Sequence, residues 1–376
     1  MRQIINILGV GIVILIVVVV IAGCIIPRES VEVPHIALAS VHSSPIVATH
    51  SFPFEQASVT IILPVDAALY DGARSTDKSV AIRGNVSEKV WVSDSYRAMI
   101  NDSAQDKFYS DLTGEFAKMK QAQQLSDDEY VELMMVYVQS LTYVTKPGSP
   151  AKFPVETAVD QSGDCDDKSL LLAGLLAHEG YKVALFVFDP ESHMAVGIGS
   201  ADSLYRDTGY AYIETTNFSF AGVPPDTLKG GVVLRSAPLV IPISTGTRTY
   251  SSGKETTYIN NAVLRADQKA AELATQIEPL DTELTIKKGQ ISDLEAQMQQ
   301  LKSTGNIPEY NAQVSAHNAL VSEYNARLSA YRELVARYDE YASVHNYVND
   351  HAYDRKGVYE YVKAHMPDGP YGSVLM

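Results

Sequence analysis

Two long runs of apolar residues in steps of three and four occupy residues 258–352 and constrain the fold more than any other feature of this chain. The first run extends from Leu273 to Leu301 and the second from Tyr310 to His345, with Ser303-Thr304-Gly305-Asn306 between them. Sustained 3-4 spacing on both sides of a short polar turn predicts an antiparallel coiled-coil hairpin. Each arm of about 40 residues would be roughly 60 Å long at 1.5 Å per residue. We expect Pro279 to kink the first arm or to break it locally.

The N-terminal segment predicts attachment to a membrane. From Ile7 to Ile26 every residue is apolar or glycine, a stretch about long enough to cross a bilayer core, and Arg2 precedes it. The end of this segment, Ile21-Ala22-Gly23-Cys24, is similar to a lipoprotein signal in which Cys24 would be lipid-modified. We therefore expect residues 1–27 to be a lipoprotein signal or a plain membrane anchor, two alternatives that the sequence leaves open. Both place the rest of the chain at the cell membrane, on its extracytoplasmic face.

Composition excludes one broad class of function. The chain has 376 residues, enough for more than one structural unit, and a formal net charge of −15. Phosphate contacts require basic patches, and no cluster of lysine and arginine stands out, so we expect no nucleic-acid partner.

The middle of the chain predicts an α+β domain over residues 89–250. Ser126-Asp127-Asp128-Glu129 is a capping box that starts a helix, and a second apolar helix follows Cys165. Strand-like runs come next, separated by turn residues: Tyr181–Phe188, Met194–Ile198 and Tyr210–Thr215. A helix packed on an antiparallel sheet is the expected arrangement. We expect residues 28–88 to form a spacer with short strands and residues 353–376 to form a C-terminal tail.

Cys165 is the residue that points to chemistry. Apart from Cys24 it is the chain's sole cysteine, so we expect a free thiol. It opens a helix in the run Gly163-Asp164-Cys165-Asp166-Asp167, where the positive end of the helix dipole favours thiolate. We interpret Asp164 as the N-cap and Asp166 and Asp167 as complements to the dipole. The spacing of these aspartates is not that of an EF-hand calcium loop, so we expect no metal here. We expect no cofactor either.

Two residues downstream of Cys165 are candidates to complete a catalytic site. A cysteine nucleophile needs a base, and the base needs an acceptor that orients it. His193 begins one strand-like run and Glu214 ends another. If these runs are adjacent and antiparallel, the two side chains meet at one edge of the sheet, over the start of the Cys165 helix.

Four stretches of sequence carry a family pattern: Pro154-Val155-Glu156-Thr157-Ala158, Gly163-Asp164-Cys165-Asp166-Asp167, Leu171-Leu172-Ala173-Gly174-Leu175-Leu176 and Gly180-Tyr181-Lys182-Val183. Together they resemble the transglutaminase-like superfamily of papain-like cysteine enzymes, and the segments of His193 and Glu214 fall where that family places its histidine and acidic strands. The resemblance covers about residues 125 to 220. The family usually has aspartate where this chain has Glu214, and the coiled-coil hairpin is outside the family core.

The resemblance implies acyl transfer through a thioester. Cys165 would attack an amide carbonyl, His193 would act as base and acid, and Glu214 would hold the imidazole. We expect a membrane-tethered cysteine peptidase or amidase, a hydrolase whose substrate is a protein or peptide. A protein-glutamine transamidase is one alternative. Another is a non-catalytic surface scaffold whose coiled coil binds a protein partner or a second copy of the chain.

Overall fold

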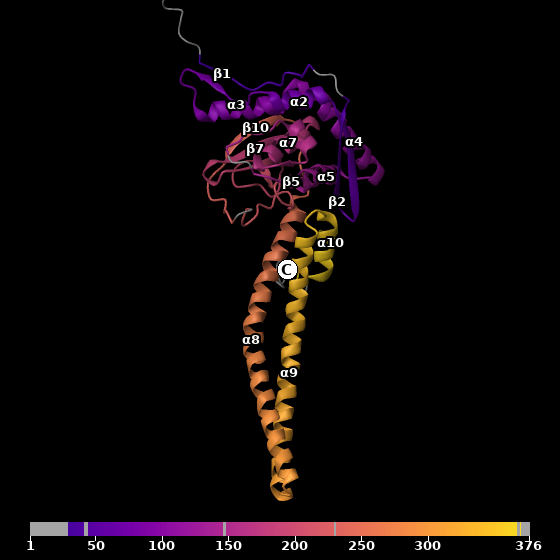
Figure 1. The fold of residues 1–376 in the computed structure, drawn as a ribbon, viewed down its shortest axis with the longest axis vertical. Coiled ribbons are helices and arrows are strands. Elements are labelled where there is room, and N and C mark those ends of the chain that lie inside the picture. Colours follow the sequence, from indigo (N-terminus) through magenta and orange to yellow (C-terminus); the bar gives the residue numbers. More distant parts are fainter. Residues whose placement is uncertain (1–28, 41–43, 146–147, 229–230, 367–368, 370–376) are drawn as a thin grey trace, which may run out of the picture.

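The computed structural model describes residues 29–40, 44–145, 148–228, 231–366 and 369. A globular α+β part carries a long helical hairpin, which projects from the end opposite to the first strand (Figure 1). The expected anchor or signal, residues 1–27 with Cys24, lies outside the described residues. Within the described part of the chain, no helix combines the length and the apolar character needed to cross a bilayer.

The elements follow one another along the chain with short connections. The helices are α2 (Ala67–Ser75), α3 (Glu88–Ile100), η1 (Ser103–Gln105), α4 (Asp106–Gln123), α5 (Asp127–Ser140), α6 (Pro154–Asp160), α7 (Cys165–His178), η2 (Asp189–Glu191), α8 (Gly253–Ser303), α9 (Ile307–Asp350) and α10 (Arg355–His365). The strands are β1 (Ser30–Glu32), β2 (Ile46–Phe54), β3 (Ala57–Val65), β4 (Ala81–Arg83), β5 (Thr142–Tyr143), β6 (Ser162–Gly163), β7 (Lys182–Phe188), β8 (His193–Gly199), β9 (Tyr210–Ile213) and β10 (Leu239–Thr245).

A four-stranded antiparallel sheet forms the centre of the globular part. Its strand order is β10-β7-β8-β9, so the three predicted strand runs are confirmed as neighbours and β10 adds an edge strand that the sequence pattern did not reveal. Helix α7 packs on one face, where Leu170, Leu171 and Leu172 are fully buried in the main core. The other face carries a smaller aromatic cluster around Phe186, Phe188 and Tyr212.

Within residues 28–88, which we expected to form a spacer with short strands, the strands β2 and β3 are present and belong to the main core. Strands β2 and β3 pair as a long antiparallel hairpin, and on β3 the buried residues alternate with exposed ones. Phe52, Val59 and Ile61 belong to the same core cluster as the leucines of α7. Side chains of a strand alternate between its two faces, so buried and exposed residues that alternate indicate one buried face. The buried face of the β2–β3 hairpin packs against α4, α5 and α6.

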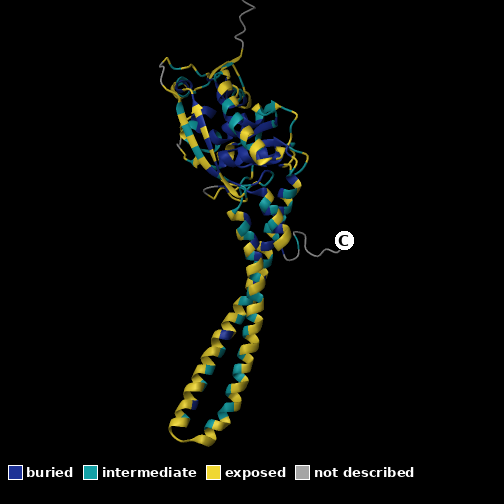
Figure 2. Ribbon diagram, turned by 90° about the vertical axis from the view of Figure 1, so that its right-hand side faces the viewer, coloured by how far each residue is buried: buried dark blue, intermediate teal, exposed yellow. Residues whose placement is uncertain are grey.

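The projecting hairpin consists of α8 and α9, joined at the predicted turn. Gly305 lies there in a left-handed conformation, with a φ of 75°, that glycine adopts at little cost. Two ion pairs, Lys287 with Glu323 and Arg327 with Glu283, and a hydrogen bond between His317 and Glu295 cross between the arms. As the residue number rises on one helix it falls on the other, as antiparallel arms require. Figure 2 shows that most of the hairpin surface is exposed or only partly buried.

The local break expected at Pro279 is absent, because α8 continues through this residue as a single helix. The proline is exposed, so its ring lies toward solvent. Proline removes one backbone donor from a helix, and packing of α8 along α9 offsets the loss. Figure 1 shows α8 bowed away from α9 over part of its length.

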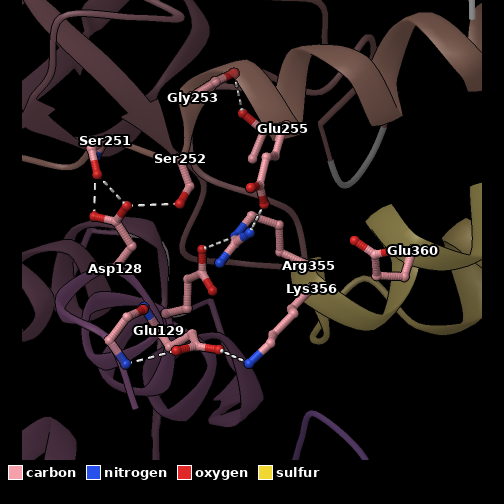
Figure 3. A network of polar contacts seen from close by, with 12 residues as sticks. Asp128, Glu129, Ser251, Ser252, Gly253, Glu255, Arg355, Lys356 and Glu360 are labelled. Carbon is pink, nitrogen blue, oxygen red and sulfur yellow. Dashed lines mark hydrogen bonds and ion pairs between the residues drawn. The ribbon is translucent and has the colours of Figure 1, made fainter. Parts of the chain in front are cut away.

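A polar network joins the hairpin to the globular part. The segment 353–376, expected as a tail, contains α10, whose first residue Arg355 bonds to Glu132 of α5 and to Glu255 of α8. Lys356 bonds to Glu129, also of α5, at 2.7 Å. Figure 3 shows Arg355 with Glu255 and Lys356 with Glu129. It also shows Asp128, which accepts hydrogen bonds from Ser251 and Ser252 just before α8 begins. The base of the hairpin is therefore held to α5 by charged hydrogen bonds.

Candidate active site

Cys165 is the first residue of α7, as predicted. Asp164 and Asp167 form a reciprocal capping box: each side chain accepts a hydrogen bond from the backbone N–H of the other. The Cys165 Sγ lies 3.9 Å from the carbonyl oxygen of Ser192, the residue that precedes His193. The thiol is thus brought to the start of the histidine strand by the helix that packs on this sheet.

The surroundings of Cys165 oppose the thiolate, contrary to the expectation from the helix dipole. Burial of the sulfur, followed by the charges of Asp166, Asp164 and Glu214, raises the pKa of the thiol to about 12, although a backbone hydrogen bond from Met194 lowers it. A helix start offers only about half a positive charge, which does not outweigh burial and several carboxylates. The resting thiol is therefore neutral at pH 7, and an ionised nucleophile requires a base.

Three aspartates surround the start of α7. Carboxylate oxygens of Asp164, Asp166 and Asp167 lie within 4.8 Å of one another. Burial, together with the hydrogen bond to Asp164, raises the pKa of Asp166 to about 9, and burial raises the pKa of Asp167 to about 6. Asp166 is thus protonated at pH 7, which relieves the crowding of like charges. Carboxylate oxygens of Asp164 and Asp167 accept the backbone hydrogen bonds of the capping box. We therefore interpret the three aspartates as a helix cap.

Replacing Asp166 by asparagine should make the Cys165 thiol more reactive at alkaline pH. Above about pH 9 the wild-type Asp166 side chain ionises and opposes the thiolate, whereas asparagine stays neutral. The rate of alkylation by iodoacetamide, followed by mass spectrometry of the Cys165 peptide, should therefore rise above pH 9 in D166N and change little at pH 7. D207N, the same substitution at an exposed aspartate, serves as the matched control. Equal alkylation rates of Cys165 in D166N and wild type at pH 10 would show that the charge of Asp166 does not act on the thiol.

His193 and Glu214 meet at one end of the sheet. The Nε2 atom of His193, the first residue of β8, lies 3.1 Å from Oε2 of Glu214, which directly follows β9. The same carboxylate oxygen accepts a hydrogen bond from the Tyr212 hydroxyl at 2.7 Å. A hydrogen bond from Nε2–H to Glu214 leaves Nδ1 as the unprotonated nitrogen of a neutral imidazole. Tyr212, which also donates a hydrogen bond to the Glu214 carboxylate, was not among the predicted site residues.

Glu214 is held ionised and in one orientation. Its Oε1 atom accepts from the backbone N–H groups of Thr215 and Thr216 and from the Thr216 hydroxyl. Burial opposes ionisation, but the hydrogen bond and charge of His193 and the hydrogen bonds from Thr216 and Tyr212 lower the pKa of Glu214 to about 2. Five donors around one carboxylate fix its plane, and with it the plane of the imidazole that it binds.

A small cavity of about 140 Å³ opens beside the imidazole. It is lined by Tyr143, Glu191, Ser192, His193, Thr216, Leu228 and Val232. Ser192 is thus shared between the cavity and the contact of the Cys165 sulfur. A substrate group that enters this space lies next to the imidazole.

The structure brings two of the three predicted residues into direct contact and places the third close to them in the fold. His193 and Glu214 are hydrogen bonded, whereas Cys165 Sγ contacts the backbone on either side of His193, at the Ser192 carbonyl and the Met194 N–H, and no hydrogen bond between the sulfur and the imidazole is seen among the described residues. Strand periodicity could have revealed Tyr212, because residues two apart on a strand share a face. Comparison of the chain with protein-family models, curated proteins and solved structures found no match.

Proposed function

We propose that this protein is a cysteine-dependent peptidase or amidase of the transglutaminase-like, papain-like type, with Cys165, His193 and Glu214 as its triad. It acts on a protein or peptide at the extracytoplasmic face of the cell membrane, to which the N-terminal segment tethers it. The observation that carries the proposal is the hydrogen bond of 3.1 Å between His193 Nε2 and Glu214, with the Cys165 sulfur against the neighbouring Ser192 carbonyl.

Acylation uses His193 as base and then as acid. The Nδ1 atom takes the thiol proton as Sγ forms a bond to the amide carbon, and the resulting imidazolium is stabilised by Glu214. The negative charge that develops on the carbonyl oxygen is placed at the start of α7, where the Cys165 backbone N–H is available as a donor. The intermediate collapses as the C–N bond breaks, and His193 gives its proton to the leaving amine.

Deacylation returns the enzyme to its starting state. A water molecule gives a proton to His193 Nδ1 and attacks the thioester carbon. The C–S bond then breaks, and Cys165 sulfur recovers the proton from the imidazolium, with the carboxylic acid as product. The resting thiol has a pKa of about 12. Catalysis at neutral pH therefore depends on transfer of the thiol proton from Cys165 to His193 during acylation and not on a thiolate already present in the free enzyme.

The test compares three full-length proteins: wild type, C165S and H193A. Each is incubated with a library of fluorogenic peptides, and each is alkylated with iodoacetamide between pH 5 and 10. We expect wild type to cleave members of the library and to be alkylated at Cys165 well below pH 12. C165S should lose cleavage, and H193A should lose cleavage and the reactivity at neutral pH. Added primary amines that become incorporated into product in place of hydrolysis would identify a transamidase.

A different result would support the scaffold function, which the projecting hairpin favours because its surface is mostly exposed. If C165S retains every activity of wild type, and wild-type Cys165 reacts no faster than in the denatured chain, the enzyme proposal fails. Loss of partner capture on deletion of residues 262–348 would then identify the hairpin as the functional part.

A further inference from the structure

Two hydroxyl groups are buried next to the candidate site. Ser169 is on α7, one turn after Cys165, and Thr215 directly follows Glu214; neither side chain has any exposed surface (0% for each). The Ser169 hydroxyl donates to the carbonyl oxygen of Met194 at 3.2 Å and lies 3.1 Å from the Thr215 hydroxyl. Since Ser169 has one hydrogen to donate, Thr215 is the donor in the second bond.

This short chain of hydrogen bonds touches each segment that supplies a site residue. Ser169 shares a helix face with Cys165, because residues four apart on a helix are neighbours. Met194 follows His193 on β8, and Thr215 follows Glu214. A serine buried in a helix whose next three residues are leucines is costly unless its hydroxyl is bonded. Here it is bonded to the two segments whose spacing sets the geometry of the site.

The hydroxyl chain lies on the β9 side of the histidine strand, where β8 has no strand partner, whereas on its other side β8 stays paired with β7 as far as His193. The pairing of β8 with β9 stops at Val196 and Ile213, so the residues from His193 to Ala195 face no residue of β9. Beyond that point the segment of Glu214 leaves the sheet, and the Cys165 sulfur approaches the Ser192 carbonyl. The carbonyl of Glu214 accepts from the buried Gln139 side chain at 2.8 Å instead of from a strand. On the β9 side of β8, side-chain hydrogen bonds thus take the place of backbone ones beside the triad.

We propose that Ser169 and Thr215 are positioning residues, which keep the histidine strand and the acidic segment at a set distance from the start of the cysteine helix. The inference rests on the proposed function, because it concerns the efficiency of proton transfer between Cys165 and His193. Neither hydroxyl touches the reacting atoms. Without them the split between β8 and β9 can widen, and the imidazole loses its alignment with the sulfur. A shift of about 1 Å at a reacting group is enough to cost about 100-fold in rate.

The experiment uses position 215, where the hydroxyl and the methyl group can be removed separately. T215V keeps the shape of the side chain and removes the hydroxyl, whereas T215S keeps the hydroxyl and removes the methyl. The alkylation rate of Cys165 by iodoacetamide is measured in the full-length protein from pH 5 to 10, with unfolding temperature alongside. At pH 7 we expect T215V to react about 10- to 100-fold more slowly than wild type and T215S to stay within about threefold.

Two further variants separate positioning from general stability. S169A should reproduce the loss seen in T215V, since it removes the shared partner. T113V removes a buried hydroxyl in α4 that donates to the Tyr109 carbonyl of the same helix, so it should lower the unfolding temperature without changing the pH profile of Cys165. Unchanged profiles in T215V and S169A, or equal losses in T215V, T215S and T113V, would overturn the inference.

The outcomes also separate this inference from the proposed function. If wild type and H193A have the same pH profile, the triad fails and the positioning role fails with it. If H193A loses the neutral-pH reactivity and T215V and S169A keep it, the triad stands and the positioning role alone is wrong.

Discussion

Replacing Glu214 by glutamine is expected to reduce turnover about 10⁴-fold, the loss that follows when the carboxylate of a catalytic triad becomes an amide. Two backbone N–H groups point at Oε1 and cannot turn away, so the new amide nitrogen takes the place of Oε2. There it faces His193 Nε2 with hydrogens of its own. The imidazole then carries its proton on Nδ1, the nitrogen that has to accept the proton of Cys165.

The measurement is kcat on a peptide that wild type cleaves, with KM determined in parallel. We expect the loss in kcat, since the tautomer affects proton transfer and not binding. E156Q is the matched control, because Glu156 is also buried and paired, with Lys78, but stands in α6 away from the imidazole. A loss below tenfold in E214Q, or an equal loss in E156Q, would remove Glu214 from the triad.

Glu214 should also govern part of the acid stability of the protein. Its pKa of about 2 lies below the usual 4.5, so its ionised form stabilises the folded state above pH 4.5. This contribution is lost as the pH falls from about 4.5 to about 2. The difference in free energy of unfolding between wild type and E214Q should therefore shrink over that range.

Replacing Arg355 by methionine should destabilise the folded protein by about 3–5 kcal/mol, because it leaves the buried Glu132 carboxylate without a countercharge. The Arg355 Nε atom lies 2.5 Å from Glu132 Oε1, and both side chains are almost completely buried. After the change, Glu132 retains the Tyr250 hydroxyl at 2.7 Å, a neutral partner. We expect the penalty to appear in chemical denaturation of the full chain and to separate the hairpin base from α5 first.

The pH dependence of this penalty has a definite sign. Burial outweighs the attraction of Arg355 and raises the pKa of Glu132 to about 7. In the wild type, Glu132 is therefore mostly protonated at pH 5 and mostly ionised at pH 8. Without Arg355 its pKa rises further, because the attraction that opposed burial is lost. R355M should therefore lose more stability at pH 8, where wild-type Glu132 is ionised and paired, than at pH 5, where it is already neutral. The double variant E132Q/R355M should recover most of the loss, since it leaves no unpaired charge.

The exposed pair Arg83 with Glu32 supplies the control for Arg355. Its arginine side chain is 70% exposed, and removal of such a pair costs about 0–1 kcal/mol. If R83M and R355M lowered the free energy of unfolding equally, burial of the Arg355–Glu132 pair would not contribute to stability.

Much of the local structure could be predicted from sequence because its causes are local. The capping box at Ser126, the start of α7 at Cys165 and the turn at Gly305 each depend on a few adjacent residues whose hydrogen bonds or φ angle settle the backbone. Periodicity of apolar residues likewise indicated the two long helices. The role of β2 and β3 was missed, because an alternating strand pair does not reveal which core it will cover.

The candidate site divides in the same way. Chain order and strand position were enough to predict that His193 and Glu214 would lie at one edge of the sheet, and they do. The third hydrogen-bonding group, Tyr212, depends on which strand face is buried, and the support from Ser169 and Thr215 depends on where β9 leaves the sheet. These features arise from contacts between residues far apart in the chain.

The sequence by itself determined the hairpin, the helix that begins at Cys165 and the order of cysteine, histidine and acid, since periodicity and helix capping act over a few residues. Only the tertiary structure decided the ionisation of Cys165, whose pKa rises because burial and carboxylates from separate segments act on one sulfur atom. It also decided that the hairpin is joined to the globular part through Arg355, because a buried ion pair forms only where distant chain segments exclude water together.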